Sequence, residues 1–543
     1  MIKNKKYIYY ILSISSIFVY RYYWSTVSQW REDQSTNIWL AYTKNISDMP
    51  VGLLSSKMVP NPNGIIIYGK ILTIFESLLA ATFFLSIIQI FIFYFLSREL
   101  TDNFKVNNYA FAVLSMSTLM SSSSVEFWNN WVLIFINAFF FIFILKFINT
   151  QKSEYLFISL LISFIPPALY LAGITNFIVY SFIILLSVII NGKPKAVSRK
   201  GFIYISSIVF ILINYFLIWN PYFNSTTFQE IFGFSNLTLY DRFNLLTDSV
   251  LQLPGSFLSI WTFQKSFHIL QADMDVISEL THTLFKLYVE YHKILFLIFF
   301  IFIIFGSISL TKIKNKDVNI LLIKKIFLFI TFVSSSVLLN PVLGGPNYLL
   351  LERMENMAQY YIFYILVCFL FPFVFIEFKL FHKRLIPLSQ AVFILFIFLN
   401  ITLSVNLISN SLNYDGDKLT EADVPLVYKI ELVDFIGKDS ESKPNIEDIS
   451  ISYFLGGGIW DWIPNHSEYF SKWYPDYPFT IGRAYDYQLL KKYSIKNSYE
   501  GLNSRNFKNS DYIVTYKFDQ HEVIGDENYT HHYFGQLRLS VKK

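Results

Sequence analysis

The stretch that decides the fold is "IFESLLAATFFLSIIQIFIFYFL" at residues 74–96, in which Glu76, near its start, is the only charged side chain. A helix needs about 20 apolar residues to cross the hydrocarbon core of a bilayer, and this stretch meets that length. A second stretch, "QAVFILFIFLNITLSVNLI" at 390–408, does so without any charge. We therefore expect helices that cross a membrane.

The composition agrees with that expectation. The chain has 543 residues, of which 54% are hydrophobic and only 15% charged, and this balance excludes an ordinary soluble protein. The one cysteine, Cys368, excludes an internal disulfide. The first apolar run is followed by "RYYWSTVSQW" and no small-residue cleavage site, so we interpret it as a retained first helix. We expect no nucleic-acid partner.

Hydropathy predicts an α-helical polytopic membrane protein with about eleven transmembrane helices. They are expected at 7–23, 71–96, 107–121, 131–148, 154–171, 174–190, 201–219, 293–311, 321–340, 360–378 and 387–408. Cytoplasmic loops of membrane proteins are rich in Lys and Arg. With the N-terminus in the cytoplasm every inner loop carries basic residues, whereas the short outer connection 122–130 has none. This orientation predicts a multi-pass protein of the cell inner membrane.

The same orientation divides the chain into two parts. Residues 1–408 form the membrane domain, with long outer loops at 24–70, 220–292 and 341–359. Residues 409–543 are polar and lie in the periplasm or outside the cell. Within this tail, 449–455 and 511–518 favour strands, and 425–437 and 483–493 favour amphipathic helices. We expect a small α/β domain.

Acidic residues gather on the outer side. The motif "WREDQS" at 30–35 places Glu32 and Asp33 just after the first helix, and "SSSSVEFWNNW" at 121–131 places Glu126 after the third. If these helix ends pack together, the carboxylates face one cavity. One carboxylate then serves as a general base, and the other orients the acceptor or holds a divalent cation such as Mg²⁺ or Mn²⁺. The pattern leaves both roles for the second carboxylate open.

These features resemble the GT-C superfamily of membrane glycosyltransferases, in particular its aminoarabinose and protein O-mannosyl transferase branch. The likeness is carried by the short first helix, the acidic motif after it, and Gly52, Pro60-Asn61-Pro62 and Tyr68 before the second helix. Glu126, the arginine of "NYLLLERMENMAQYY" at 347–361 and the C-terminal outer domain extend it. The resemblance implies transfer of a sugar from a polyprenyl-phosphate donor to a glycan, lipid or protein acceptor on the outer face.

The resemblance also implies roles for individual residues. Asp33 matches the catalytic base, although the order Glu-Asp differs from the family's frequent Asp-Glu and leaves Glu32 as the alternative. The proline-rich turn would position the acceptor, through Pro60, Asn61, Pro62 and Tyr68. Cations would neutralise the donor phosphate, and the candidates are Arg353, Lys57 and Lys70.

Other patterns carry less weight. Glu279 and His282 have the i, i+3 spacing of metal ligands, but no second pair accompanies them. Asp273-Met274-Asp275 lacks a surrounding nucleotide-binding fold. The aromatic residues of 456–479 either bind glycan by stacking or, as the alternative, pack a domain core or rest on the membrane interface. His531-His532 is expected to be exposed and without support from other metal ligands.

Two other classes of function are alternatives to a glycosyltransferase. An O-antigen polymerase or ligase is also polytopic, but such proteins usually lack a soluble C-terminal domain. A transporter or flippase of envelope lipids typically buries charges at mid-membrane. We expect the spans here to be almost free of charge, which favours chemistry at the outer surface over transport.

Overall fold

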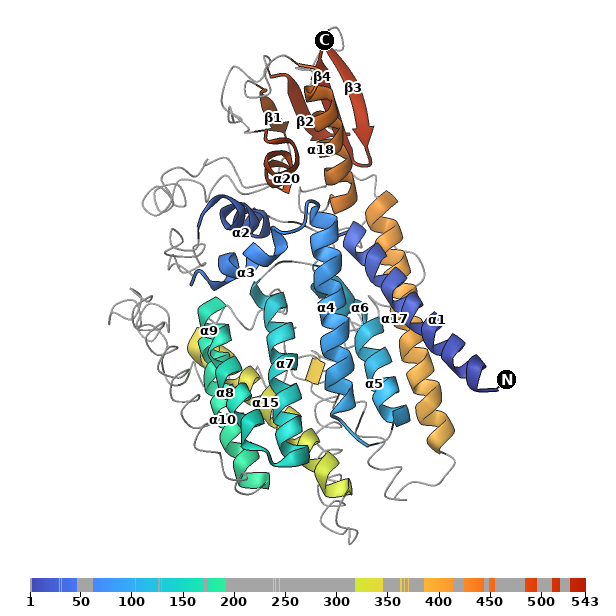
Figure 1. The fold of residues 1–543 in the computed structure, drawn as a ribbon, viewed down its shortest axis with the longest axis vertical. Coiled ribbons are helices and arrows are strands. Elements are labelled where there is room, and N and C mark those ends of the chain that lie inside the picture. Colours follow the sequence, from blue (N-terminus) through green and yellow to red (C-terminus); the bar gives the residue numbers. More distant parts are fainter. Residues whose placement is uncertain are drawn as a thin grey trace.

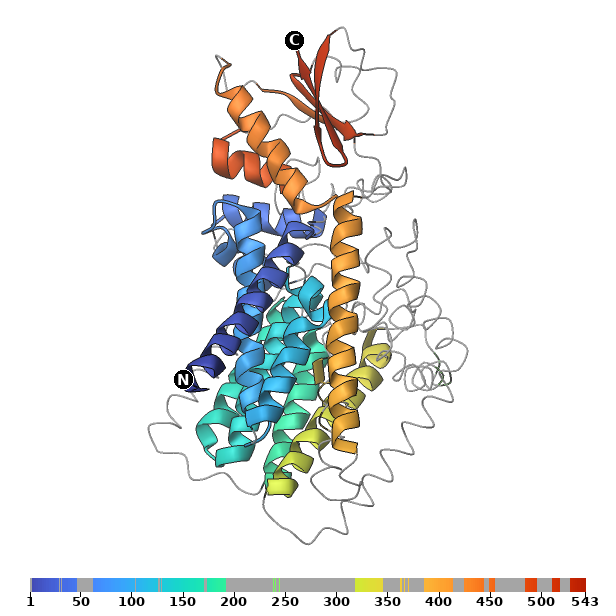
Figure 2. The same ribbon diagram turned by 90° about the vertical axis from the view of Figure 1, so that its right-hand side faces the viewer.

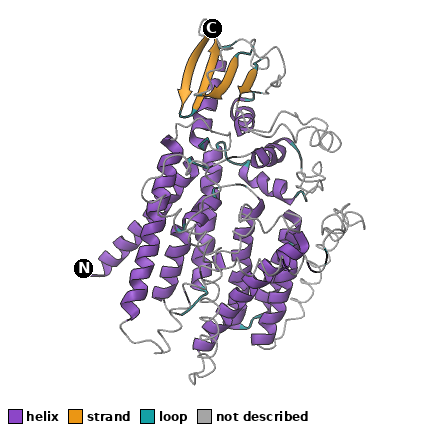
Figure 3. Ribbon diagram, turned by 180° about the vertical axis from the view of Figure 1, so that it is seen from behind, coloured by secondary structure: helices purple, strands orange, loops and turns teal. Residues whose placement is uncertain are grey.

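The computed structural model consists mostly of helices, with a small sheet at one end (Figures 1 and 3). The structure describes residues 2–28, 30, 32–45, 62–102, 104–125, 127, 129–169, 173–191, 238, 240, 244, 318–344, 362–363, 366, 370, 385–413, 424–443, 449–454, 484–495, 510–517 and 528–543. The expected spans 201–219 and 293–311 lie outside these residues, as does most of 360–378 and of the loop 220–292.

The helices follow the apolar runs. They are α1 (Ile2–Thr26), α2 (Glu32–Thr43), α3 (Gly64–Leu72), α4 (Leu78–Arg98), α5 (Phe104–Met116), α6 (Thr118–Ser124), α7 (Asn129–Thr150), α8 (Ser153–Ser163), α9 (Ile165–Leu169), α10 (Gly173–Asn191), α15 (Val318–Gly344), α17 (Leu385–Asn413), α18 (Leu426–Ser440) and α20 (Ala484–Tyr493). Each expected span within the described residues is helical. Among the described helices, Leu78–Arg98 and Val132–Thr150 are long and apolar enough to cross a bilayer by length and composition.

Three of the expected spans are interrupted. The span 71–96 is divided because Ser77 has an extended backbone (φ −113°, ψ 135°) and its side chain accepts a hydrogen bond from the Leu79 amide at 3.2 Å, which begins α4. Ser117 divides 107–121 because its backbone is also extended (φ −62°, ψ 129°), although its side chain makes no capping hydrogen bond. The span 154–171 breaks at Phe164, just before Pro166 and Pro167.

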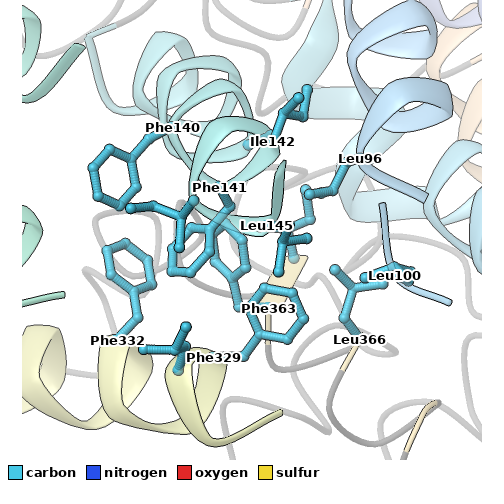
Figure 4. Packing of buried hydrophobic residues seen from close by; sticks show 14 of the residues in the cluster. Leu96, Leu100, Phe140, Phe141, Ile142, Leu145, Phe329, Phe332, Phe363 and Leu366 are labelled. Atoms are coloured by element: carbon cyan, nitrogen blue, oxygen red, sulfur yellow. The ribbon is translucent and has the colours of Figure 1, made fainter. Parts of the chain in front are cut away.

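The helical bundle has an aromatic core (Figure 4). The ring of Phe141 on α7 lies 4.4 Å from that of Phe363 and 5.0 Å from that of Phe332 on α15. Phe140 stacks on Tyr180 of α10, with ring centroids 3.9 Å apart. Through these ring contacts α7 packs against α10 and α15.

The C-terminal domain contains the expected strands β1 (Ile451–Phe454) and β2 (Tyr512–Tyr516), and the helices α18 and α20 match the two expected amphipathic helices. Two further strands, β3 (Tyr529–Phe534) and β4 (Leu537–Lys542), were not predicted. The sheet order is β1-β2-β4-β3; β1 and β2 are parallel and the other pairs antiparallel.

The domain sits on one end of the helical bundle, hereafter the domain end (Figure 1). The helices α2 and α3 lie between the bundle and the sheet, and α17 runs along the bundle toward α18 (Figure 2). The Tyr428 hydroxyl of α18 donates to the Leu412 carbonyl at 3.0 Å, and the Gln536 amide donates to the Ser411 carbonyl at the same distance. The end of α17 is thereby tied to the domain.

Candidate active site at the domain end

The segment before Glu32 is held against the segment before Glu126. The hydroxyl of Ser28 donates to the Val125 carbonyl at 2.6 Å, and both residues are buried. Trp30 is buried as well, and its ring stacks on that of Phe127 at 6.1 Å with the planes 27° apart. The ends of α1 and α6 therefore pack together, which is the condition on which the sequence argument for a shared cavity depended.

Phe127 also joins the third predicted element. The Tyr68 ring of α3 stacks on Phe127 at 5.8 Å with the planes 24° apart, so Phe127 contacts both Trp30 and Tyr68. Burial raises the pKa of the Tyr68 phenol to about 12, which keeps it protonated and able to donate a hydrogen bond at neutral pH. Three segments far apart in the sequence thus meet around one phenylalanine ring.

The predicted carboxylates belong to these segments. Glu32 and Asp33 form the first turn of α2, and Glu32 stands two residues after Trp30. Their side chains lie outside the described part of the structure. Glu126 lies outside it too, between the described residues Val125 and Phe127. The described backbone brings the neighbours of all three acids together, and the orientation of the acids stays a prediction.

The turn "VPNPNG" ends at a close contact between helices. A Cβ added to Gly64 would overlap the carbonyl oxygen of Ala168 on α9, so glycine lets the start of α3 approach that backbone. One and a half turns later, a Cβ on Gly69 would lie 3.1 Å from Ala41 on α2. Pro62 is half-buried, whereas Pro60 and Asn61 lie outside the described residues.

Among the predicted phosphate ligands the structure describes Lys70, and Arg353 and Lys57 lie outside. The ammonium of Lys70 donates to the Lys44 carbonyl, just after the end of α2. This bond satisfies a carbonyl left without an intrahelical partner. Lys70 therefore has a structural role in joining α3 to α2, and its phosphate-binding role stays a prediction.

Cations of the C-terminal domain reach the same region. The ammonium of Lys429 on α18 is buried and donates to the Trp30 carbonyl at 3.1 Å. Lys491 on α20 donates to the Thr73 carbonyl at 2.9 Å and lies over the Tyr42 ring of α2 at 4.8 Å. Lysines of the predicted C-terminal domain thus bind the backbone around the candidate site.

A buried arginine lies in the bundle near this end. Arg21 on α1 is 0% exposed. Its Nε donates to the Ser115 carbonyl at 3.0 Å, and its Nη1 lies 2.7 Å from both Gln89 Oε1 and Ser124 Oγ. Nη1 also reaches the Met120 carbonyl at 3.2 Å and Ser86 Oγ at 3.4 Å.

Polar side chains continue from this layer to α17. The Thr118 amide donates to Asn400 Oδ1 at 3.0 Å, which satisfies the first orphan donor of α6. Ser404 lies 3.0 Å from the Thr118 hydroxyl and 2.5 Å from the Tyr20 hydroxyl. The polar layer thus links α1, α4, α5, α6 and α17.

Our expectation of nearly charge-free spans was wrong. Arg21 lies in the expected span 7–23, and Lys325 lies in 321–340. Both are buried. Lys325 donates to the Glu99 and Leu100 carbonyls at 2.7 and 2.8 Å, and so closes the end of α4. A charged residue inside an apolar run is itself the signal that identifies such a position.

The remaining predicted sites give no centre in the described residues. His531 Nδ1 lies 2.9 Å from the Ser540 hydroxyl, and the His532 ring packs on Phe435 at 4.3 Å. Within the described ranges no group of three His, Cys, Asp or Glu could hold a metal ion. Residues Glu279 and His282 and the segments 273–275 and 456–479 lie outside them.

The local geometry is thus a meeting of three chain segments beneath a docked domain, with a buried guanidinium in the bundle beside them. Comparison of the sequence with protein-family models and with curated proteins finds no match.

Proposed function

We propose that this chain is an integral membrane glycosyltransferase. It moves a sugar from a polyprenyl-phosphate donor to an acceptor at the domain end. The observation that carries the proposal is the meeting of Trp30, Phe127 and Tyr68, because it gathers the backbone around Glu32, Asp33 and Glu126. Catalysis by paired carboxylates requires such proximity.

The outer surface of the bundle supports a membrane location. Large apolar side chains are more than half exposed on helices that contribute to the bundle: Phe91 and Phe95 on α4, Leu185 and Ile189 on α10, and Ile394 and Phe398 on α17. Leaving such side chains in water costs about 1.5–3 kcal/mol each compared with burial. Lipid tails remove that cost, so a bilayer explains why these helices present apolar faces outward.

In the proposed reaction Asp33, or Glu32 in the alternative, takes the proton of an acceptor hydroxyl or amine. The deprotonated atom attacks the anomeric carbon of the sugar, and the bond from that carbon to the phosphate oxygen breaks. The phosphate leaves with the electron pair, and cations such as Arg353 and Lys57 stabilise it. Attack on the face opposite the leaving group inverts the anomeric centre without a covalent intermediate.

The test is mass spectrometry of envelope glycans and lipids from strains with matched protein levels. We expect deletion and Asp33→Asn to lose the same sugar, and Glu126→Gln to lower its amount. Asp102→Asn, at the opposite end of α4, is the matched control and should leave the sugar intact. If Glu32→Gln lost the sugar and Asp33→Asn retained it, the general base would be Glu32 and not Asp33. An unchanged glycan profile in the deletion strain would refute the transferase.

The buried Arg21 favours one second candidate, a transporter or flippase of envelope lipids, because transporters bury charges among their helices. The two functions differ in what the cell accumulates. Loss of a transferase leaves a lipid-linked sugar on the outer side, whereas loss of a flippase leaves it on the inner side. Access of an impermeant periodate reagent to the accumulated lipid distinguishes these outcomes.

A further inference from the structure

The C-terminal domain meets the rest of the chain on two different sides. On one side, Tyr428 and Gln536 donate to the carbonyls of Leu412 and Ser411 at the end of α17. On another side, α20 lies over α2 (Figures 1 and 2). The chain enters the domain from the end of α17, so the first set of contacts stands beside the covalent connection and the second stands away from it.

The second side is formed around the Tyr42 ring of α2. The ammonium of Lys491 on α20 lies over this ring at 4.8 Å, and the Tyr487 ring meets it edge to face at 5.7 Å. We call these three residues the α2–α20 contact. Lys491 also donates to the Thr73 carbonyl at 2.9 Å. Water can replace a backbone carbonyl as the partner of an ammonium, so this bond can break without leaving a charge unsolvated.

Polar groups without a partner are enclosed at the α2–α20 contact. Tyr487 is buried, and its hydroxyl has no hydrogen-bond partner among the described residues. Ser35 stands two helical turns before Tyr42 and therefore lies on the same face of α2; its buried hydroxyl has no described partner either. The same holds for the indole N–H of Trp30, whose ring belongs to the apolar cluster that contains Tyr487.

These features act in opposite directions on the docked arrangement. A buried polar group without a partner disfavours it, because water satisfies that group once the two surfaces separate. The bond of Lys491, and that of Gln488 to the Glu76 carbonyl at 3.3 Å, favour it by effects of similar size. Domains of one chain move relative to one another unless the interface between them is large and apolar. The docked and separated arrangements are therefore close in free energy.

We propose that the C-terminal domain is a hinged cover. It turns about its contacts with the end of α17 and separates α20 from α2, which exposes Ser35 and the Trp30 indole to water. Glu32 and Asp33 stand between these two residues in the chain, so the same motion opens the surface around the first turn of α2. If the chain is the transferase proposed above, the open arrangement admits the acceptor; the motion itself does not depend on that chemistry.

The experiment measures how fast a buried thiol reacts with a water-soluble maleimide in the full-length protein in nanodiscs. Cys368→Ser removes the native thiol, and Ser35→Cys places one of nearly the same shape beside the α2–α20 contact. Ser440→Cys is the matched control, because Ser440 is also buried but lies within the domain, toward the far end of α18. We expect the thiol at position 35 to react roughly fivefold or more faster than the thiol at position 440, since local opening exposes only the former.

Two variants should shift this rate in opposite directions. Tyr487→Phe keeps the ring and removes the unpaired hydroxyl, so the thiol at position 35 should react more slowly. Lys491→Met removes the bond to the Thr73 carbonyl, so the thiol should react faster, each change being roughly fivefold or more. Lys492→Met is the control: this neighbouring ammonium binds Asp434 of its own domain at 2.8 Å, and its loss should leave the rate unchanged.

Equal reaction rates at positions 35 and 440, or a rate at position 35 that Lys491→Met does not change, would show that the domain is a fixed part of the fold. If Ser35→Cys fails to fold, hydrogen exchange of residues 32–43 compares Tyr487→Phe with Lys491→Met instead, and equal exchange would overturn the proposal. Neither readout depends on glycan transfer. Loss of sugar in Asp33→Asn with a fixed domain keeps the transferase and removes the cover, whereas an opening domain with no glycan change in the deletion strain does the reverse.

Discussion

The ammonium of Lys429 lies 3.1 Å from the carbonyl oxygen of Trp30, a residue 399 positions earlier in the chain. Lys429 is 1% exposed, so the bond forms away from water, where a charged donor is strong and an unpaired one is costly. The C-terminal domain thus holds the connection between α1 and α2 directly before Glu32 and Asp33. It contributes to the candidate site as a positioning element.

Replacing Lys429 with Met removes this bond and leaves the Trp30 carbonyl buried without it. We expect stability to fall by about 1–3 kcal/mol, and transfer of the sugar to fall with it, because the first turn of α2 loses a support. Thermal unfolding of the purified protein and mass spectrometry of envelope glycans measure the two effects. Lys438→Met, on the exposed face of α18, should change neither, and equal behaviour of the two variants would contradict a positioning role.

Phe127→Ala should be among the most damaging substitutions at the domain end. Its ring is 0% exposed and stacks on both Trp30 and Tyr68. Truncation of a buried phenylalanine costs about 3–5 kcal/mol, and the three segments would separate. The unfolding midpoint and the amount of transferred sugar in the envelope should both fall.

The matched control for Phe127 is Phe139→Ala on α7. Phe139 is 41% exposed on the bundle surface, so its removal creates no enclosed cavity. If Phe139→Ala lost as much stability as Phe127→Ala, burial of the Phe127 ring would not be the cause of the loss.

Two glycines of α3 should respond differently to alanine. At Gly64 the new Cβ would overlap the Ala168 carbonyl, which belongs to the backbone and cannot move aside without shifting α9. We expect a cost of about 1–3 kcal/mol or more. At Gly69 the nearest atoms are side-chain carbons 3.1 and 3.2 Å away, which can adjust. The unfolding midpoint should therefore be highest for the wild type, lower for Gly69→Ala and lowest for Gly64→Ala. A lower midpoint for Gly69→Ala than for Gly64→Ala would contradict the close approach of Gly64 to the Ala168 carbonyl.

The sheet should lose stability in acid through Asp511. Partial burial by itself raises the pKa of this carboxyl, but two hydrogen bonds from Ser450 at 2.9 Å and the nearby Lys443 outweigh it and hold the pKa below its ordinary value. A carboxyl with a depressed folded-state pKa stabilises fully above its unfolded value of about 4. That contribution is lost as the pH falls through the folded value.

The measurement compares unfolding midpoints of the wild type and Asp511→Asn at pH 7 and near pH 3. The wild type should be more stable at pH 7, and the difference should shrink at the lower pH. Ser450→Ala removes the side-chain donor, so its pH-dependent difference from Asp511→Asn should be smaller than that of the wild type. A difference independent of pH would exclude the ionised carboxylate as its source.

Part of the fold could be predicted because it depends on local patterns. The long apolar runs predicted the positions of α7, α10 and α17, a short apolar stretch predicted β2, and amphipathic spacing predicted α18. The breaks at Ser77 and Ser117 escaped prediction, because serine is ordinary within apolar helices and only the extended backbone that both residues adopt here makes each a boundary. The β3–β4 hairpin was missed although β4, LRLSVK, alternates apolar and polar residues and Gly535 in the turn has φ +54°. Only β3, YTHHYF, lacks such a pattern.

The candidate site divides in the same way. The sequence identified which residues carry suitable chemistry, Glu32, Asp33 and Glu126 above all. Whether their helix ends meet was left as a condition, and the Ser28–Val125 hydrogen bond shows that the segments beside them do. The sequence did not identify Lys429, whose role depends on a partner 399 residues away. It also passed over Arg21, whose surroundings come from three other helices.

The sequence by itself determined that apolar helices dominate this chain, that a polar α/β domain follows them, and which carboxylates stand after the first and third apolar runs. Those properties follow from hydropathy and spacing, which act over a few residues. The tertiary structure alone decided that Phe127 joins three segments, that a lysine of the last domain holds the first loop, and that Arg21 is enclosed. Such contacts depend on packing between distant residues, and no local pattern records which distant groups will exclude water together.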